Sequence, residues 1–370
     1  MSDYEVRRFE PGDADGFRSL YATVMDERKG HEWFAWKYAE NPYADGAPGM
    51  VAMHNGTLVA ARPLLALPVR VDGEREVALQ PADTMVHPDH RRQGLFTRMT
   101  ERALEHYGAD HPFFFNFPNE RSREGYRKLG WAVVSERESY YRIQNPRALG
   151  RSRGDGVAVR LASAAATPVA RAYCAIRDRT APASPDIAVR TASDPAATLA
   201  DLAASPPPDR IHAARDEEFY RWRLGNPDWE YTAYVAEREG DPTAAVVAGT
   251  ASDAGGATDS GSATDWGPTT TQILDVAPLE GAPEDALAAA VGRIVADHAA
   301  TDVFVAPPQG IPAGVLRAFG FHAGSGPPFS WVASPTSHVV RAMPADRSTQ
   351  GSPLADPGGW LLTFVEADTS

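Results

Sequence analysis

The sequence predicts an α/β protein of the α+β kind, built as two tandem lobes that each hold a mixed, mostly antiparallel sheet flanked by helices. The chain has 370 residues, 43% of them hydrophobic, which is enough for about two domains of ~150 residues each. Similar stretches recur about 185–190 residues apart, which indicates an internal duplication. Asn55-Gly56 and Asp72-Gly73 join apolar runs and are typical of tight hairpins, so neighbouring strands should run antiparallel.

The duplication is clearest in two pairs of segments. Residues 32–42, EWFAWKYAENP, resemble 217–227, EEFYRWRLGNP, and residues 111–131 resemble 301–321. The segment GVAVRLASAAATPVARAYC, near the start of the second copy, aligns loosely with the N-terminal YEVRRFEPGDADGFRSLYA. We therefore expect a first domain over residues 1–145, a linker over 146–156 and a second domain over 157–370.

The first copy has a readable order of elements, β-α-β-β-β-α-β-α-β. After Asp13, a candidate N-cap, apolar residues recur on one helical face. Trp33 and Trp36 belong to the repeated motif, and because the second copy keeps its aromatic character we interpret them as core anchors. The expected elements are a strand over residues 4–9, a helix from 13, three strands across 49–88, a helix over 95–107, a strand over 112–117, a helix over 119–129 and a strand over 132–143.

Composition and charge exclude several classes of partner. The net charge is −13, which disfavours steering toward nucleic acid or an anionic membrane. No apolar run approaches the ~18 residues of a membrane span, so we expect a cytoplasmic protein. Cys174 is the only cysteine, which excludes an internal disulfide and a multi-cysteine metal site, and we expect no metal. Only three of the 36 cationic residues are lysines, a bias that resembles proteins of salt-loving microbes.

The stretch HPDHRRQGLFTRM, residues 87–99, joins a predicted strand to a predicted helix. Gly94 at the start of that helix lets backbone approach a ligand closely, and the free N–H groups there favour an anion. Arg91 and Arg92 add positive charge beside it. The loop therefore predicts a phosphate site.

This loop, the later segment NERSREGYRKLGW and the order of elements together resemble the GNAT superfamily of acyl-CoA N-acyltransferases over most of residues 1–143. Arg91, Gly94 and Phe96 occupy the three marked places of the family's Arg/Gln-x-x-Gly-x-Gly/Ala loop. Phe96 replaces a small residue, as in the Eis-like and polysaccharide-cluster branches. The family's second signature is met by Asn119, Ser122, Tyr126, Lys128, Gly130 and Trp131.

The resemblance implies acetyl-CoA as co-substrate, with backbone amides of the loop holding its pyrophosphate. Asn119, at the start of a helix, would cap that helix and also touch the pantetheine arm. The cofactor-binding residues implied are Met85, Val86, Arg91, Arg92, Gln93, Gly94, Leu95, Phe96, Thr97 and Asn119.

Transfer to an amine needs a group that protonates the departing thiolate and one that takes a proton from the ammonium. The resemblance assigns the acid role to Tyr126. Asp83, three residues before Val86, stands where the family often places a glutamate base acting through water. His87 is the alternative base, and an amine of low pKa would need none.

The second copy lacks these groups. Its aligned loop carries Glu280, Glu284 and Asp285 instead of arginines, and Leu316 stands opposite Tyr126. Like charges would repel a pyrophosphate. We therefore expect a degenerate lobe that shapes the acceptor cleft, with residues 359–370 as its last strand.

The resulting expectation is an acetyl-CoA-dependent N-acetyltransferase that transfers the acetyl group directly to an amine of a small molecule or a protein. The acceptor and any homo-oligomerisation stay open. One alternative is an aminoacyl-tRNA-dependent transferase of the FemX-like type, against which the acidic charge and the intact loop argue. The other is a non-catalytic CoA-binding protein, which the joint retention of Tyr126 and the loop disfavours.

Overall fold

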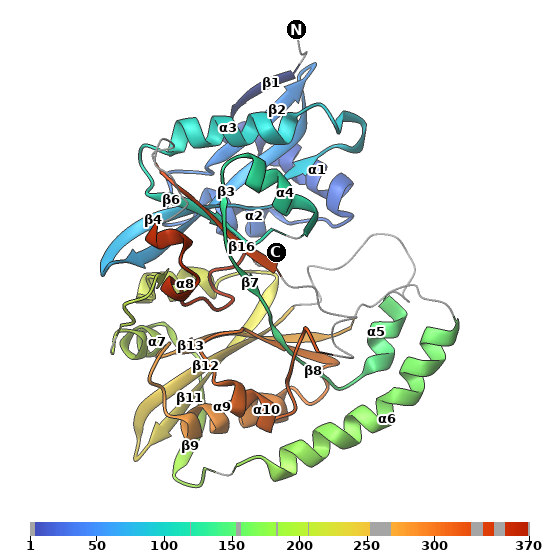
Figure 1. Ribbon diagram of the computed structural model, residues 1–370, viewed down its shortest axis with the longest axis vertical. Helices are drawn as coiled ribbons and strands as arrows, with labels where there is room; N and C mark the ends of the chain where they lie inside the picture. The colour runs from blue at the N-terminus through green and yellow to red at the C-terminus, as the bar shows by residue number, and fades with distance from the viewer. Residues whose placement is uncertain are drawn as a thin grey trace.

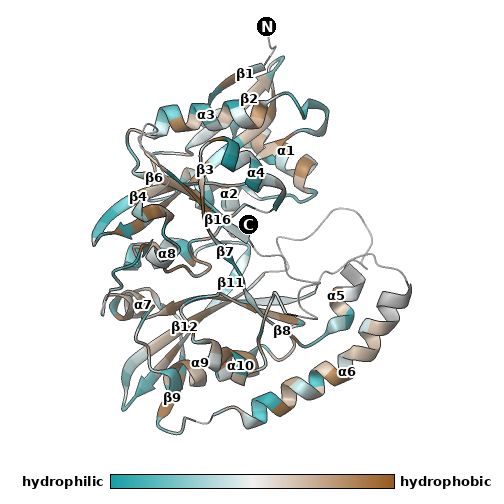
Figure 2. Cartoon of the chain, in the orientation of Figure 1, coloured by the Kyte–Doolittle hydropathy of each residue, from teal (hydrophilic) through white to brown (hydrophobic). Residues whose placement is uncertain are grey.

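The computed structural model describes residues 4–118, 120–152, 157–182, 184–205, 207–251, 268–326, 336–343 and 352–368. Two sheets form the two lobes, and helices cover each of them (Figure 1). This confirms the predicted class, a mixed α/β chain of two lobes. In Figure 2 apolar residues concentrate along strands of both sheets.

The first sheet has nine strands in the order β1-β2-β3-β4-β6-β16-β7, and β5 and β10 both pair with β3. All its neighbours are antiparallel except β4 and β6. Both expected hairpins are present, with positive φ at Asn55 (50°) and Asp72 (50°) and at the glycine that follows each. The strands are β1 (Tyr4–Arg8), β2 (Gly49–His54), β3 (Thr57–Val71), β4 (Glu74–Pro81), β5 (Met85–Val86), β6 (Phe113–Asn116), β7 (Ala132–Arg137), β10 (His212–Ala213) and β16 (Thr336–Ala342).

The helices of this lobe follow the predicted order. Phe17, Leu20 and Tyr21 are buried on one face of the first helix, as the sequence pattern requires. The helices are α1 (Ala14–Met25), α2 (His31–Phe34), which continues into a π-helical turn over Ala35–Ala39, α3 (Leu95–Tyr107) and α4 (Glu120–Lys128).

The second sheet has seven strands in the order β15-β8-β14-β13-β12-β11-β9. Its strands are β8 (Tyr140–Ile143), β9 (Ile187–Ala192), β11 (Trp229–Arg238), β12 (Asp241–Ala251), β13 (Thr270–Ala277), β14 (Val303–Ala306) and β15 (His322–Ala323). Its helices are α5 (Pro146–Ser152), α6 (Val157–Thr180), α7 (Ala196–Ala203), α8 (Glu217–Arg223), α9 (Glu284–Asp297) and α10 (Ala313–Ala318).

Strand pairing crosses between the two halves of the sequence, which corrects the prediction of one strand over residues 132–143. That segment divides into β7, which stays in the first sheet, and β8, which pairs with β14 of the second. The late strand β16 enters the first sheet between β6 and β7. Because ladder partners come from distant sequence, local pattern does not reveal this exchange. The division at 146–156 stays a prediction, and residues 146–152 of the expected linker are helical.

Two further expectations about the second copy are wrong. Its opening segment aligns loosely with the strand and helix that open the first copy, yet residues 157–180 form one long helix, α6, in keeping with their high alanine content. The strand-helix pair β9–α7 follows instead. Of residues 359–368, only Trp360 forms a β-bridge, to Ile211, and the segment adds no strand to the second sheet.

The repeated motif packs at the junction of the lobes. Trp33 is 1% exposed in a core that also includes Phe219 and Tyr220 of the second copy. Trp36 stacks on Trp222, and each indole N–H donates to the backbone carbonyl of the other residue. The interpretation of both tryptophans as structural anchors is confirmed.

Candidate active site

The first sheet opens at the end of β4. Strand β4 pairs with β6 only through Leu79 and Phe114, whereas β5 turns back to pair with Ala60 and Ala61 of β3. The turn between β4 and β5 contains Asp83 with φ of 40°, a conformation that costs energy for a residue other than glycine. Strands β5 and β6 therefore diverge and leave an opening between them in the sheet.

A cavity of about 710 Å³ lies at this opening, between the two sheets and the C-terminal segment. The first lobe contributes Asp83, Thr84, Asn116 and Tyr126 among others. The second sheet and the C-terminal segment close it with Tyr141, Trp229, Gln272, Phe364 and Asp368. The predicted acid and the predicted base thus line one cavity, although no residue of the loop at 91–94 does.

Hydrogen bonds from two neighbouring side chains orient the hydroxyl of Tyr126, which lies on α4. Asn116 Nδ2 donates to this hydroxyl at 2.6 Å, and Arg62 Nη2 donates to it at 3.3 Å. The orientation of the Asn116 amide is set because its Oδ1 accepts from the N–H of Phe117 at 2.8 Å. Both neighbours are donors, so the hydroxyl oxygen accepts twice and its proton is free to be donated into the cavity.

Arg62 is a site residue that the sequence analysis missed. Its side chain is fully buried, and Nη1 donates to Thr84 Oγ1 at 3.2 Å. The guanidinium carbon lies 4.7 Å from the ring centroid of Phe96 and 5.3 Å from that of Tyr126. It therefore connects the acid to the residue next to Asp83. An arginine inside the apolar run of β3 was the available signal.

Asp83 belongs to a buried cluster that includes a second carboxylate. Its Oδ2 accepts from Lys37 Nζ at 2.8 Å and from the hydroxyl of Tyr38. Lys37 also forms an ion pair with Asp368. Burial opposes the charge of Lys37, but Asp368 and Asp83 outweigh it and raise the pKa of the ammonium. Burial and then the nearby Asp83 raise the pKa of Asp368.

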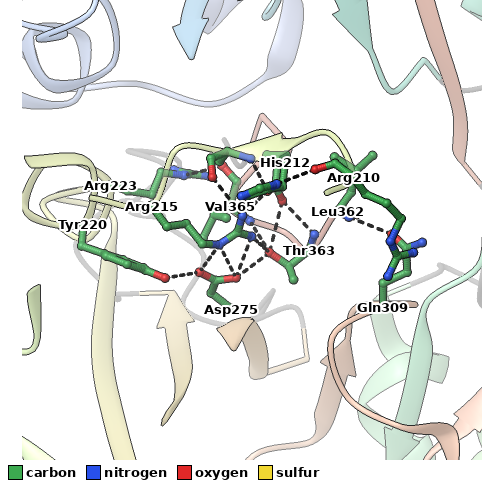
Figure 3. A network of polar contacts seen from close by, with 12 residues as sticks. Arg210, His212, Arg215, Tyr220, Arg223, Asp275, Gln309, Leu362, Thr363 and Val365 are labelled. Carbon is green, nitrogen blue, oxygen red and sulfur yellow. Dashed lines mark hydrogen bonds and ion pairs between the residues drawn. The ribbon is translucent and has the colours of Figure 1, made fainter. Parts of the chain in front are cut away.

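Buried arginines hold the C-terminal segment in place, and Figure 3 shows Arg215 and Arg223 beside Thr363 and Val365. Arg215 pairs with Asp275 at 2.9 Å and with Glu366 at 2.8 Å. Arg223 donates to the carbonyls of Val365 at 3.1 Å and Ala367 at 2.9 Å. Burial works against ionisation of Glu366, but Arg215 and two backbone N–H groups keep its pKa below the usual value.

The loop at residues 87–97 has the form that an anion site needs. Gly94 caps the start of α3 with φ of 72°. An added Cβ would meet open space there, so the positive φ, and not a lack of room, is what favours glycine. Arg91, Arg92 and Gln93 are exposed. The first N–H groups of the helix, those of Leu95, Phe96 and Thr97, precede its first intrahelical bonds.

The other predicted cofactor residues take different positions. The side chains of Met85 and Leu95 are buried in the core, so only their backbone can reach a cofactor. Val86 is half-buried at the end of β5, and its carbonyl accepts from Arg91 Nε at 3.3 Å. His87 accepts from the N–H of Asp89 and does not line the cavity. Asn119 lies outside the described residues.

The N-terminal part of the chain matches a known protein family. Residues 5–134 match the family model described as the acetyltransferase (GNAT) domain. Residues 5–134 therefore form a GNAT acetyltransferase domain within the first lobe. The chain therefore carries an acyltransferase domain, and the match covers the strand opening, the loop, Asp83 and Tyr126. No functionally curated protein matches the sequence.

Solved structures share the fold of the GNAT domain and its partner lobe. N-myristoyltransferase of Saccharomyces cerevisiae with bound myristoyl-CoA has 12% identity and a TM-score of 0.60, covering 100% of this chain and 86% of that one. A tandem GNAT protein from the clavulanic acid biosynthesis pathway has 12% identity and a TM-score of 0.55, covering 92% and 98%. Eis1 of Mycobacterium abscessus has 15% identity and a TM-score of 0.50, covering 92% and 73%. At these identities the likeness is one of fold.

Two general findings bear on the class of site. Within the described residues no helix is both long and apolar enough to cross a membrane. In the same part of the chain, no group of three or more histidine, cysteine and acidic side chains is arranged to hold a metal ion.

Proposed function

We propose that this protein transfers an acetyl group from acetyl-CoA directly to an amine, using the first lobe as its catalytic unit. The observation that carries the proposal is that Tyr126, with its hydroxyl proton free, lines the same cavity as Asp83 and Asp368. The GNAT domain match supports the acyl-CoA donor.

The loop would hold the donor by its pyrophosphate. Arg91 and Arg92 supply positive charge, and the N–H groups at the start of α3 supply donors and the positive end of the helix dipole. The pantetheine arm would enter the opening between β5 and β6, and a backbone N–H near Val86 would polarise the thioester carbonyl.

Proton transfer would use the buried cluster and the tyrosine. Asp83 or Asp368 takes a proton from the ammonium, directly or through water, and the neutral nitrogen attacks the thioester carbon. A new C–N bond forms, the nitrogen gives its second proton to water, the tetrahedral intermediate collapses, and the C–S bond breaks. Tyr126 gives its proton to the departing thiolate, and bulk water returns one to the tyrosine.

The second lobe would close the cavity without binding a cofactor of its own. Glu284 and Asp285 occupy the first turn of α9, and Glu280 lies just before it. Two of these carboxylates pair with arginines, Glu280 with the half-buried Arg210 and Asp285 with the exposed Arg238. The same proposal places the enzyme in the cytoplasm, where acetyl-CoA is available.

A thiol-release assay with acetyl-CoA against a broad panel of amines tests the proposal. We expect CoA release that depends on one class of amine, with the N-acetyl product identified by mass spectrometry. CoA binding without release for any amine would instead favour the binding-protein alternative. Transfer only from a charged tRNA would favour the aminoacyl-tRNA-dependent one.

A further inference from the structure

Arg137, the last residue of β7, is a cation on the wall of the cavity that the proposed chemistry does not use. Its side chain is 9% exposed. Nη2 donates to the carbonyls of Leu362 at 3.2 Å and Thr363 at 2.9 Å, and the guanidinium lies 4.6 Å from the ring centroid of Phe117. These contacts fix its position.

The other N–H groups of Arg137 are available to bind a ligand. Nε and Nη1 have no acceptor among the described residues, and unlike Nε of Arg62 they are not sealed from solvent. Burial lowers the pKa of Arg137 to about 10, against the opposing influence of Glu366, so the group stays charged at neutral pH. A buried cation without a paired anion is costly, which suggests that a ligand supplies the anion.

The cavity carries the opposite charge elsewhere. Asp83 and Asp368 both form ion pairs with Lys37, and the more distant charge of Arg223 also acts on Asp368, so this part of the wall presents carboxylates to a ligand. Within the described residues neither carboxylate forms an ion pair with Arg137, so the two charges occupy separate parts of the wall. Glu366 is the carboxylate whose charge acts on Arg137, and it is already paired with Arg215.

We infer that the acceptor is a zwitterion, an amine that also carries a carboxylate, with the carboxylate bound by Arg137 and the amine directed to Asp83 and Asp368. This inference rests on the proposed function and adds the class of substrate. The donor's phosphates do not fill this role, because none of the residues Arg91, Arg92, Gln93 and Gly94 lines the cavity. Arg137 also borders a hollow of about 290 Å³, but that hollow contains neither Asp83 nor Tyr126.

The test uses matched pairs of acceptors with the full-length protein. Aminoalkyl carboxylates of increasing chain length are compared with their primary amides, and an aminoalkyl phosphonate series is run beside them. For each pair the ratio of kcat/KM for the carboxylate to that for the amide is measured. At the best chain length this ratio should be about 10 to 100, the usual scale for a charged hydrogen bond.

Three variants separate anion binding from the contacts of Arg137 with the C-terminal segment. In Arg137→Gln the ratio should fall close to the value that the difference in amine basicity between the two acceptors alone would give. The fall should come mainly from a higher KM for the carboxylate acceptor. Arg137→Lys, which keeps the charge, should restore part of the ratio. Arg190→Gln removes an exposed arginine that pairs with Glu237 and should leave the ratio unchanged.

The outcomes distinguish the two proposals. An equal fall in kcat/KM for both members of every pair in Arg137→Gln would show a structural role alone and overturn the inference. Efficient transfer to amides without preference for carboxylates would overturn it while leaving the acetyltransferase proposal intact. A preference for phosphonates over carboxylates would show that the anionic group of the acceptor is not a carboxylate, which would overturn the inference. Absence of transfer to every amine, with CoA bound, would overturn both.

Discussion

The side-chain amide of Asn116 donates a hydrogen bond of 2.6 Å to the hydroxyl of Tyr126, from the end of β6 to helix α4. The amide cannot turn over without losing its bond from the N–H of Phe117. The phenol is therefore fixed as an acceptor on this side, and its proton is left for the cavity. Strand β6 thus both bounds the opening in the sheet and orients the candidate acid.

Replacing Tyr126 by phenylalanine keeps the ring that packs on Phe96 and Trp131 and removes only the hydroxyl. We expect kcat to fall about 100-fold or more, the usual scale for general acid catalysis. CoA affinity, measured by calorimetry, should change little. Tyr234→Phe, which removes a hydroxyl bonded to His298 in the second lobe, is the matched control. Wild-type turnover in Tyr126→Phe, with chemistry rate-limiting, would remove the tyrosine from the mechanism.

The sequence predicted those parts of the fold that depend on local chemistry. Asn55-Gly56 and Asp72-Gly73 adopt the positive φ angles that their hairpins require, and Gly94 does the same at the start of α3. The helical face at Phe17, and the strand of three phenylalanines in β6, also follow from periodicity and apolar character. These features need no knowledge of distant partners.

The exchange of strands and part of the site depend on distant partners and could not be predicted. Strand β16 fits between β6 and β7 because all its ladder bonds are made to residues about 200 positions earlier. Asp368 reaches Lys37 only because buried arginines hold the C-terminal segment at the junction of the lobes. A single carboxylate near the end of a chain gives no local signal of such a place.

Replacing Arg91 and Arg92 together by alanine should weaken CoA binding. Each exposed guanidinium is expected to make a charge-assisted contact with phosphate, so we expect a loss of at least tenfold in Kd at low salt. The difference from wild type should shrink as the ionic strength rises, because exposed charges are screened. Arg102→Ala, on the exposed side of α3 and paired with Glu105, is the control. Unchanged affinity in the double variant would reject the loop as the pyrophosphate site.

Each chain should bind one CoA. A helix N-terminus supplies only about half a unit of positive charge, and two carboxylates in the first turn of α9 outweigh it. Titration calorimetry of the wild-type protein should therefore give a stoichiometry near one. The Arg91/Arg92 double variant should lose this single event rather than reveal a second. A stoichiometry near two would show that the second lobe binds the cofactor.

Removal of Arg215 should destabilise the protein strongly. Arg215→Leu leaves Asp275 and Glu366, each 1% exposed, without their shared cation. Breaking a buried ion pair in this way costs about 3–5 kcal/mol, which should appear as a lower free energy of unfolding in denaturant titrations. Arg238→Leu breaks an exposed pair with Asp285 and should cost less than about 1 kcal/mol. Similar losses in the two variants would contradict a stabilising role for the buried network.

Stability should fall below pH 6.5 in part because of His338, a 1% exposed residue in β16 that packs edge-on against Trp360. Burial and then the positive charge of Arg137 lower the pKa of His338 to about 3. Above the unfolded pKa of about 6.5 the imidazole is neutral in both states and its contribution is fully present. As the pH falls below that value only the unfolded chain binds the proton, so the free energy of unfolding decreases by up to about 1.4 kcal/mol per pH unit.

The variant His338→Phe keeps a planar ring against Trp360 but cannot take up a proton. The difference in unfolding free energy between wild type and His338→Phe should therefore shift in favour of the variant between pH 6 and pH 4, because all other titrating groups are common to both and cancel. Urea titrations at several pH values measure it, and His106→Gln, at an exposed position on α3, is the control. A difference that stays constant across this range would mean that His338 becomes protonated in the folded protein, which would also bring a second cation next to Arg137.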